Sequence, residues 1–270
     1  MNDQNNNWKA LGNYFRETQN PFITDLFHQA IFPWSPLEKL VDHITSLFEN
    51  LENKGDIPAK KTVLRHQNQS LLEGAYFVNE TSILAEDFID SELRILIKKG
   101  TFLEAGATIK NHTVIEEKCE IRQGAYLRGF CYIGQNCVVG HTSEIKHSVF
   151  IRHVEAGHFA YIGNSIIGSF VNLGAGTKIS NLQFRNFDDK KRIHFPEIPF
   201  NIQGKKIDTG LAKFGAVIGD GCETGCNSVL SPFVFLEPEC WIMPNVNVLK
   251  GVYPKGCMIK NLQDCKKYNK

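Results

Sequence analysis

Residues 97–151 read "IKKGTF LEAGAT IKNHTV IEEKCE IRQGAY LRGFCY IGQNCV VGHTSE IKHSVF I", and every sixth residue from the first is Ile, Leu or Val. Four residues after these aliphatic positions the chain carries small or modest side chains, mostly Thr, Ala, Cys and Ser. A helix period of 3.6 or a strand period of 2.0 does not by itself produce a six-residue repeat. A parallel β-helix does, because each short strand turns one aliphatic side chain inward and a small residue fits the tight corner.

The same ladder returns later in the chain, as Ile218, Leu230, Leu236, Ile242 and Val248, with an interruption at Thr224. We therefore expect stacked coils over residues 82–181 and 216–259. Most of the cysteines fall on the small-residue positions of the repeat, where a buried free thiol is an ordinary core side chain. Off the ladder, Cys226 and Cys265 are expected to react with thiol reagents, whereas five thiols should be protected: Cys119, Cys131, Cys137, Cys222 and Cys240.

The repeat is broken once within its first block, in "VEAGHFAYIG", residues 154–163. Gly157 stands where the next aliphatic residue is due, and the phase resumes at Ile162 after five residues instead of six. A lost residue pushes the backbone out of its regular path and often re-aims a side chain. We expect that side chain to be His158, with a histidine at a purely structural bend as the alternative.

The first eighty residues show a different pattern. Within residues 36–51 apolar side chains recur at spacings of three and four, which predicts an amphipathic helix. We expect residues 1–80 to form a small helical region that caps the end of the stack or makes oligomer contacts, with an independent binding module as the alternative. Residues 81–262 would form the β-helix, with a protruding basic loop at 183–210, and residues 263–270 a tail.

Bulk composition limits the possible partners. The 30 Lys and Arg and 29 Asp and Glu give a net charge of +1 without a basic or acidic tract, so nucleic acid is not an expected partner. The first residues lack a charged-then-apolar signal pattern, and no apolar run reaches the ~18 residues needed to cross a bilayer. A cytoplasmic protein without membrane contact is the expectation.

Four segments resemble the acetyltransferase half of bifunctional glucosamine-1-phosphate acetyltransferase/N-acetylglucosamine-1-phosphate uridylyltransferase, with the archaeal-type sugar-phosphate nucleotidylyltransferases most similar. They are "SEIKHSVF", "EAGHFAYIG", "SIIGSFVNLGAGTKISNLQF" and "KKIDTGLAKFGAVIGDGCETG". The resemblance implies a mainly β fold, a left-handed parallel β-helix, and a homotrimer with active sites between subunits. It also implies acetyl transfer from acetyl-CoA, without a metal, to the amine of an amino-sugar 1-phosphate, toward a UDP-N-acetylglucosamine-type sugar nucleotide.

The resemblance carries roles onto single residues. His158 matches the proton acceptor, and an imidazole with an ordinary pKa near ~6.5 can accept an amine proton close to neutral pH. Two cationic side chains can bind the negative charge of a phosphomonoester, and hydroxyl or amide side chains can hydrogen-bond to sugar hydroxyls. The implied substrate residues are Arg128, Lys146, Tyr161, Asn172 and Asn181, and the implied acetyl-CoA residues are Ala175 and Cys226.

Three departures from the family are visible. A nucleotidylyltransferase half is a full α/β domain of over two hundred residues, so uridylyl transfer is not expected from the region before the repeats. Cys226 stands where the family has serine, and Pro244 where it has alanine, and both departures bear on acetyl-CoA affinity. Leu182 replaces a tyrosine of the bacterial enzymes but is shared with the archaeal-type members.

Three other functions compete with acetyl transfer. Solenoid acyltransferases that load UDP-sugars in lipid A synthesis share the expected fold, but their signature residues do not occur in this sequence. A zinc hydratase of the carbonic anhydrase type would use histidines among His112, His141, His147, His153 and His158, but their six-residue steps turn to different faces. A non-catalytic sugar-nucleotide-binding or scaffold protein is the remaining alternative.

Overall fold

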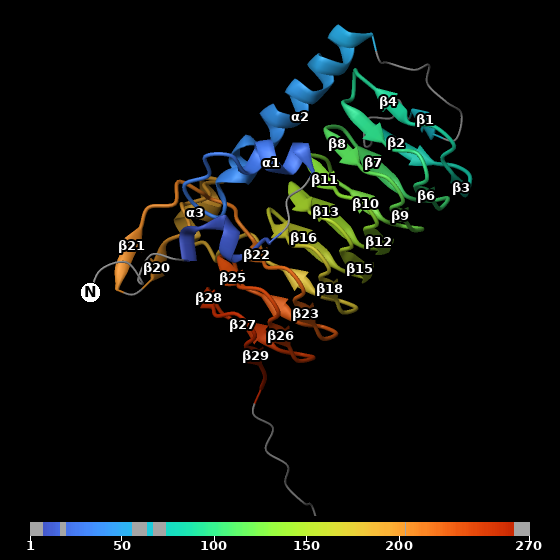
Figure 1. Ribbon diagram of the computed structural model, residues 1–270. Helices are drawn as coiled ribbons and strands as arrows, with labels where there is room; N and C mark the ends of the chain where they lie inside the picture. Colours follow the sequence, from blue (N-terminus) through green and yellow to red (C-terminus); the bar gives the residue numbers. More distant parts are fainter. Residues whose placement is uncertain (1–7, 17–19, 56–63, 67–73, 203, 262–270) are drawn as a thin grey trace, which may run out of the picture.

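The structure is a computed structural model that describes residues 8–16, 20–55, 64–66, 74–202 and 204–261. It is mainly β, a left-handed parallel β-helix whose strands form three nine-stranded sheets (Figure 1). Sheet A contains β1 (Leu64–His66), β2 (Ala75–Val78), β7 (Thr108–Lys110), β10 (Tyr126–Leu127), β13 (Glu144–Lys146), β16 (Tyr161–Gly163), β19 (Lys178–Ile179), β24 (Val229–Leu230) and β27 (Asn247–Val248).

The other two large sheets complete each coil. Sheet B contains β3 (Ser82–Ile83), β6 (Phe102–Leu103), β9 (Glu120–Ile121), β12 (Val138–His141), β15 (Glu155–His158), β18 (Asn172–Leu173), β23 (Glu223–Thr224), β26 (Trp241–Ile242) and β29 (Met258–Ile259). Sheet C contains β4 (Phe88–Asp90), β5 (Ile95–Ile97), β8 (Thr113–Ile115), β11 (Cys131–Ile133), β14 (Ser148–Phe150), β17 (Ile166–Ile167), β22 (Ala216–Ile218), β25 (Val234–Leu236) and β28 (Gly251–Tyr253).

The aliphatic ladder forms the core of the stack, as the sequence predicts. From Ile97 to Ile145 each predicted aliphatic side chain is fully buried inside the coils, and so are Ile218, Leu230 and Leu236. Burial of one such side chain contributes roughly 1.5–3 kcal/mol. The five ladder cysteines are buried in the same core, whereas Cys226 is exposed. Cys265 lies outside the described residues.

The lost residue is not at Gly157, so that prediction was wrong. Ile145 still aligns with Leu127, but the next inward position, aligned with Ile133, is Phe150 and not Ile151. The chain has therefore dropped one residue at the corner before β14. Ala156 then takes the inward place beside Val139. Ile151 is buried in a second core outside the coils.

A second core lies on the outer face of sheet C. Here successive coils present a row of apolar side chains: Leu96, Val114, Tyr132, Val149, Ile166, Val217 and Phe235. Helices α1 (Pro21–Phe27) and α2 (Ser35–Lys54) cover this row (Figure 1). Phe22 of α1 stacks on Tyr132 with ring centroids 4.3 Å apart, and Trp34 lies 6.0 Å from Phe235.

This helical region does not cover the end of the stack, and the oligomer contacts expected of it stay a prediction. The predicted amphipathic helix exists as α2, and its buried residues include Leu37, Leu40, Ile44 and Phe48. It lies along the side of the stack because the apolar row on sheet C offers it a long apolar surface. The first coil is instead covered by β2, β3 and β4, which pair antiparallel with β7, β6 and β5.

The insertion at residues 183–210 protrudes only in part. It contains a short helix, α3 (Phe187–Lys191), and a hairpin of β20 (Phe200–Ile202) and β21 (Lys205–Ile207) (Figure 1). Phe184 and Phe187 are exposed, whereas Phe200 is fully buried with its ring 5.5 Å from that of Trp8. The insertion therefore completes the second core from the side opposite to its exposed tip.

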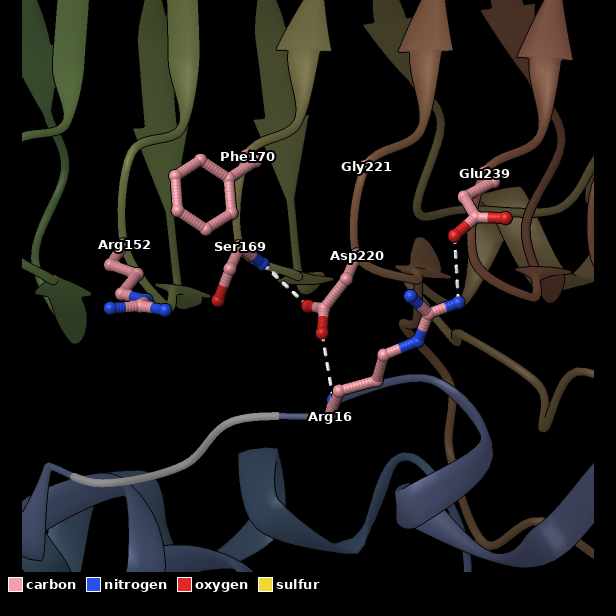
Figure 2. A pocket seen from close by; sticks show the side chains of 7 residues that line it. All are labelled: Arg16, Arg152, Ser169, Phe170, Asp220, Gly221 and Glu239. Carbon is pink, nitrogen blue, oxygen red and sulfur yellow. Dashed lines mark hydrogen bonds and ion pairs between the residues drawn. The ribbon is translucent and has the colours of Figure 1, made fainter.

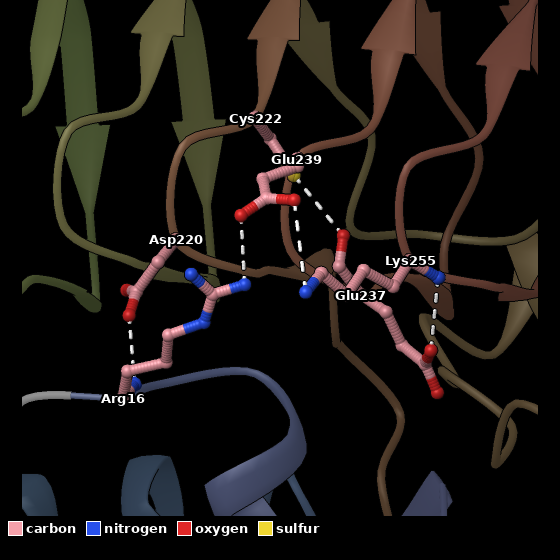
Figure 3. Close-up of polar contacts among 6 residues, drawn as sticks. All are labelled: Arg16, Asp220, Cys222, Glu237, Glu239 and Lys255. Carbon is pink, nitrogen blue, oxygen red and sulfur yellow. Dashed lines mark hydrogen bonds and ion pairs between the residues drawn. The ribbon is translucent and has the colours of Figure 1, made fainter.

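The segment before α1 is tied to coils from the far end of the chain. The Arg16 backbone N–H donates to Asp220 at 2.7 Å, and the Arg16 guanidinium donates to Glu239 at 2.7 Å (Figure 3). Lys255 lies 3.7 Å from the same Glu239 carboxylate. Exposed pairs of this kind contribute little individually. In the described part of the chain no helix is both long and apolar enough to cross a membrane.

Candidate active site

The corner between sheets B and A carries three of the predicted site residues in one column. The Gly176 N–H donates to the His158 carbonyl at 2.9 Å, and the Asn227 N–H donates to the Ala175 carbonyl at 2.8 Å. These bonds place His158, Ala175 and Cys226 at equivalent positions of consecutive coils. The residue predicted to accept a proton and the two residues predicted to contact acetyl-CoA therefore share one edge of the molecule.

The His158 imidazole is available for proton transfer. The residue ends β15 and is exposed. Its ring makes no hydrogen bond to the residues that the structure describes, and Phe159 is the ring beside it at 6.1 Å. His141, the aligned residue one coil earlier, is different, because its Nδ1 donates to the Gln123 carbonyl at 2.9 Å. Of this aligned pair, His141 has one ring nitrogen hydrogen-bonded to the backbone, whereas neither ring nitrogen of His158 is bonded to a described residue.

Sheet A carries the predicted phosphate-binding cations. Arg128 and Lys146 follow the aligned residues Leu127 and Ile145 of β10 and β13, so they neighbour each other on the outer face. Arg128 donates to Glu144 at 2.5 Å. Burial and the nearby charges of Lys213 and Arg128 lower the pKa of Lys146. An anion placed here would relieve the repulsion among the cations.

Lys213 is a member of this cluster that the sequence analysis did not single out. Its effect on the pKa of Lys146 places it near that group. The insertion positions it, because the Lys213 ammonium lies 4.9 Å from the Phe195 ring centroid, with the Arg185 guanidinium 4.1 Å from the same ring. Lys213 lies in "GLAKFG", within one of the segments that carry the resemblance. Because it follows the insertion, the six-residue repeat does not predict which residues lie beside it.

Tyr161 and Asn181, two of the predicted substrate residues, are hydrogen-bonded to each other. The Tyr161 hydroxyl donates to Asn181 Oδ1 at 3.3 Å, and Asn181 Nδ2 donates to Asn164 Oδ1 at 2.7 Å. Gly163 leaves the space for this contact, because a Cβ there would lie 2.7 Å from both Asn181 Nδ2 and the Tyr161 hydroxyl. Asn181 is only 6% exposed, which favours a role in holding Tyr161.

Asn172 is not brought together with the sheet A group. It is exposed on β18 of sheet B, aligned with Glu155 on one side and Glu223 on the other. Within one chain it therefore lies on the other side of the His158 corner from Tyr161. Its predicted contact with the substrate stays a prediction, and it requires a ligand that reaches around the corner or a second subunit.

The histidines considered for zinc do not converge. His112 and His147 precede strands of sheet C, His153 precedes β15, and His141 and His158 end strands of sheet B. His153 stacks on Phe170 with ring centroids 4.7 Å apart. Among the described residues no group of three His, Cys, Asp or Glu side chains is arranged to hold a metal ion.

A separate pocket lies at the corner between sheets C and B, beneath the N-terminal segment (Figure 2). Asp220 accepts hydrogen bonds from the Ser169 and Arg16 backbone N–H groups there, both at 2.7 Å. Burial raises the pKa of the Asp220 carboxyl. None of the predicted site residues is in its lining, which consists of Arg16, Arg152, Ser169, Phe170, Asp220, Gly221 and Glu239.

Comparison with known proteins finds similarity over the part of the chain that forms the coils. Residues 109–225 match a family model described as the GMPPB C-terminal domain, a range that includes every predicted site residue except Cys226. A bifunctional sugar-1-phosphate nucleotidylyltransferase/acetyltransferase of Sulfurisphaera tokodaii is 34% identical over 168 residues, which are 56% of this chain and 40% of that protein. The C-terminal region matches GlmU-type proteins.

Further GlmU-type relatives give the same result. The bifunctional protein GlmU of Methanococcus vannielii is 35% identical over 113 residues, which are 42% of this chain and 25% of that protein. The chain thus spans less than half of the length of either GlmU-type relative. A solved structure, the acetyltransferase domain of PglB from Neisseria gonorrhoeae, is similar at a TM-score of 0.33 and 13% identity, over 58% of this chain and 55% of that one.

Proposed function

We propose that this chain is a hexapeptide-repeat N-acetyltransferase that moves an acetyl group from acetyl-CoA to the amine of an amino-sugar 1-phosphate. The observation that supports it most directly is the column of His158, Ala175 and Cys226 at the edge of a sheet that carries Arg128 and Lys146. The proposed base and the proposed thioester site then lie at the corner between sheets B and A, and the proposed phosphate site lies on the adjacent face of sheet A. The GlmU-type relatives supply the reaction class.

In the proposed reaction the substrate amine attacks the thioester carbonyl carbon. The His158 imidazole accepts the amine proton as the new C–N bond forms, and the C–S bond then breaks. The departing thiolate of coenzyme A takes up that proton, so the imidazole returns to its neutral form. The Ala175 N–H has no hydrogen-bond acceptor among the described residues, which makes it a candidate donor to the carbonyl oxygen as negative charge develops there.

The sugar phosphate would lie against sheet A. Arg128, Lys146 and Lys213 are three cations, and Glu144 is the carboxylate that acts on both Arg128 and Lys146. A phosphomonoester with a charge near −2 matches the excess of positive charge. Tyr161 and Asn172 would contact the sugar, which fixes the amine relative to His158.

Acetyl-CoA turnover tests the proposal. The full chain is incubated with acetyl-CoA and a panel of glucosamine and galactosamine 1-phosphates and their UDP-linked forms, and free thiol release is measured. We expect turnover with a sugar 1-phosphate that carries a free amine and none with the N-acetylated sugars, which are the matched controls. Absence of turnover with every member of the panel would overturn the proposal.

A non-catalytic binding protein is the second candidate, and one observation favours it. Pro244 lies next to Cys226 in the acetyl-CoA column, since the Asn245 N–H donates to the Cys226 carbonyl at 2.9 Å. A proline there removes a backbone donor and differs in shape from the alanine of the family. Calorimetry separates the two candidates, because the binding protein retains sugar-phosphate affinity but shows no heat with coenzyme A.

A further inference from the structure

His147 links the candidate substrate site to the N-terminal helices. It lies at the corner after β13, next to Lys146, and its Nε2 is 2.9 Å from the carbonyl oxygen of Leu37 in α2. On its other side, His147 Nδ1 is 3.1 Å from Nδ2 of Asn164. None of these contacts involves a residue that the proposed reaction uses directly.

Hydrogen-bond chemistry fixes the direction of every link in this chain of contacts. A carbonyl oxygen can only accept, so His147 Nε2 carries the proton and Nδ1 is an acceptor for the Asn164 amide. Asn164 Oδ1 then faces Asn181 and accepts from its Nδ2 at 2.7 Å. That leaves Asn181 Oδ1 to accept from the Tyr161 hydroxyl at 3.3 Å.

The chain of contacts is well enclosed. Asn164 is 8% exposed and Asn181 is 6% exposed. Their backbone carbonyls accept from the Gly215 and Phe214 N–H groups, at 2.9 and 3.1 Å. A reversed amide in this enclosure would set two donors against each other, and leaving one buried polar group unsatisfied costs about 1–3 kcal/mol.

We propose that His147 is a positioning residue, which sets the orientation of Tyr161 through Asn164 and Asn181 and so makes substrate binding depend on the docked helix α2. The inference rests on the proposed function. With its proton held by Asn181, the Tyr161 hydroxyl presents its lone pairs to a donor group of the substrate. The N-terminal region would thereby contribute to substrate affinity without touching the substrate.

The chain itself supplies the variants that test this. Phe130 occupies the same corner as His147 one coil earlier, and Asn164 occupies it one coil later, all three with φ between 45° and 55°. His147→Phe therefore suits the corner and removes both hydrogen bonds. His147→Asn also suits it and retains an acceptor near the position of Nδ1, but loses the bond to Leu37.

We expect His147→Phe to raise KM for the amino-sugar phosphate by about tenfold, with KM for acetyl-CoA unchanged, because ~1.4 kcal/mol of positioning corresponds to that factor. His147→Asn should recover only part of the loss, because it restores an acceptor for the Asn164 amide but not the bond to Leu37. In a Tyr161→Phe background, His147→Phe should have no further effect on KM. His153→Phe, at another corner, is the matched control and should leave KM unchanged. An unchanged KM in His147→Phe, or additive effects with Tyr161→Phe, would overturn the inference.

A second measurement is independent of turnover. Long-range ¹⁵N–¹H correlation spectra of labelled protein report the tautomer of each histidine, and the inference requires protonated Nε2 and unprotonated Nδ1 at His147. The opposite tautomer would refute the chain of contacts even in an active enzyme. If wild type lacks turnover but shows the expected tautomer, the proposed function has failed while the hydrogen-bonded link itself stands.

Discussion

His158 is the residue on which the chemistry of the proposed function depends. Its imidazole lies exposed at the end of β15 without a hydrogen bond to the described residues, whereas the neighbouring His141 is held by the Gln123 carbonyl. A free ring can accept a proton and release it again within a turnover.

Replacing His158 should therefore separate catalysis from folding. We expect His158→Ala to lower kcat by ~10²- to 10⁴-fold, the usual contribution of a general base, and to leave the unfolding transition unchanged because the side chain is exposed. Lys146→Ala is the matched comparison and should chiefly raise KM for the sugar phosphate, since its contact is made equally in the ground and transition states. Normal turnover by His158→Ala would refute the role given to this residue.

The ladder cysteines should be protected from thiol reagents in the native protein. Burial raises the pKa of the Cys131 thiol to about 12 and also raises the pKa of the Cys137 thiol, so neither forms a reactive thiolate near neutral pH. Cys226 is exposed and should react within minutes. Mass spectrometry after a timed pulse of iodoacetamide measures this. Rapid labelling of Cys131 in folded protein would mean that its side chain does not face the core.

At the scale of single elements, the outer face of sheet C is the surface on which the N-terminal helices and the insertion pack. Its apolar row binds α1, α2 and β20 in one second core, in which Trp34 contacts Phe200, Phe214, Phe233 and Phe235. The helices are thus part of the same packed unit as the coils.

Truncation of α2 at its buried face should destabilise the whole protein. Leu40 is fully buried, so Leu40→Ala should lower the free energy of unfolding by about 2–5 kcal/mol through lost burial and the cavity left behind. Ile31 is 74% exposed, and Ile31→Ala is the control with a change within about 0.5 kcal/mol. Urea unfolding followed by tryptophan fluorescence gives both values. A wild-type value for Leu40→Ala would mean that α2 does not dock on sheet C.

Two corner histidines beside sheet C should make stability depend on pH. Burial lowers the pKa of His147 and of His112, and the charges of Lys146 and Arg94 respectively act in the same direction. The unfolded pKa is near ~6.5, so their contribution is fully present above that pH and is lost as pH falls through the lower folded values. We expect a smaller free energy of unfolding at pH 5 than at pH 7.5. The double variant His112→Phe, His147→Phe should show a weaker dependence, and an equal dependence would argue against these groups.

The repeat was predictable because its inward positions recur with one period and admit few residue types. The corner at which a residue is lost was not, since Val149, Phe150 and Ile151 are all apolar and either register leaves an aliphatic or aromatic side chain in the core. That ambiguity arises because sheet C is apolar on both faces. An outer apolar face is a property of the second core, which the periodicity of the coils alone does not reveal.

Some residues of the candidate site were predictable from the repeat and others were not. Arg128 and Lys146 occupy matching positions of successive repeats, so their proximity follows once the repeat is known. Lys213 and His147 could not be found in this manner. Their roles depend on Phe195 of the insertion and on the carbonyl of Leu37, which approach the site only in the folded chain.

At the scale of the whole molecule, Asn172 and Tyr161 lie on two different faces that meet at His158. Both would contact one ligand if a neighbouring subunit supplied one of them. We expect a homotrimer of this chain, with a sedimentation-equilibrium mass of about three times 30.5 kDa at micromolar concentration. Active-site variants supply the control, because mixing His158→Ala with Asn172→Ala subunits should restore turnover if the sites are shared. A monomer that turns over substrate would contradict shared sites.

The contact between Arg16 and Asp220 spans a sequence separation of 204 residues, and the contact between Arg16 and Glu239 spans 223. Solenoid repeats ordinarily touch only their neighbours, so such proteins can fray coil by coil from either end. Here the N-terminal segment is hydrogen-bonded to coils near the C-terminus, and the Asp220 N–H adds a backbone bond to the Tyr14 carbonyl. Separation of the coils that carry Asp220 and Glu239 must therefore break their contacts with the N-terminal segment as well as those with neighbouring coils, which couples the unfolding of the two ends of the chain.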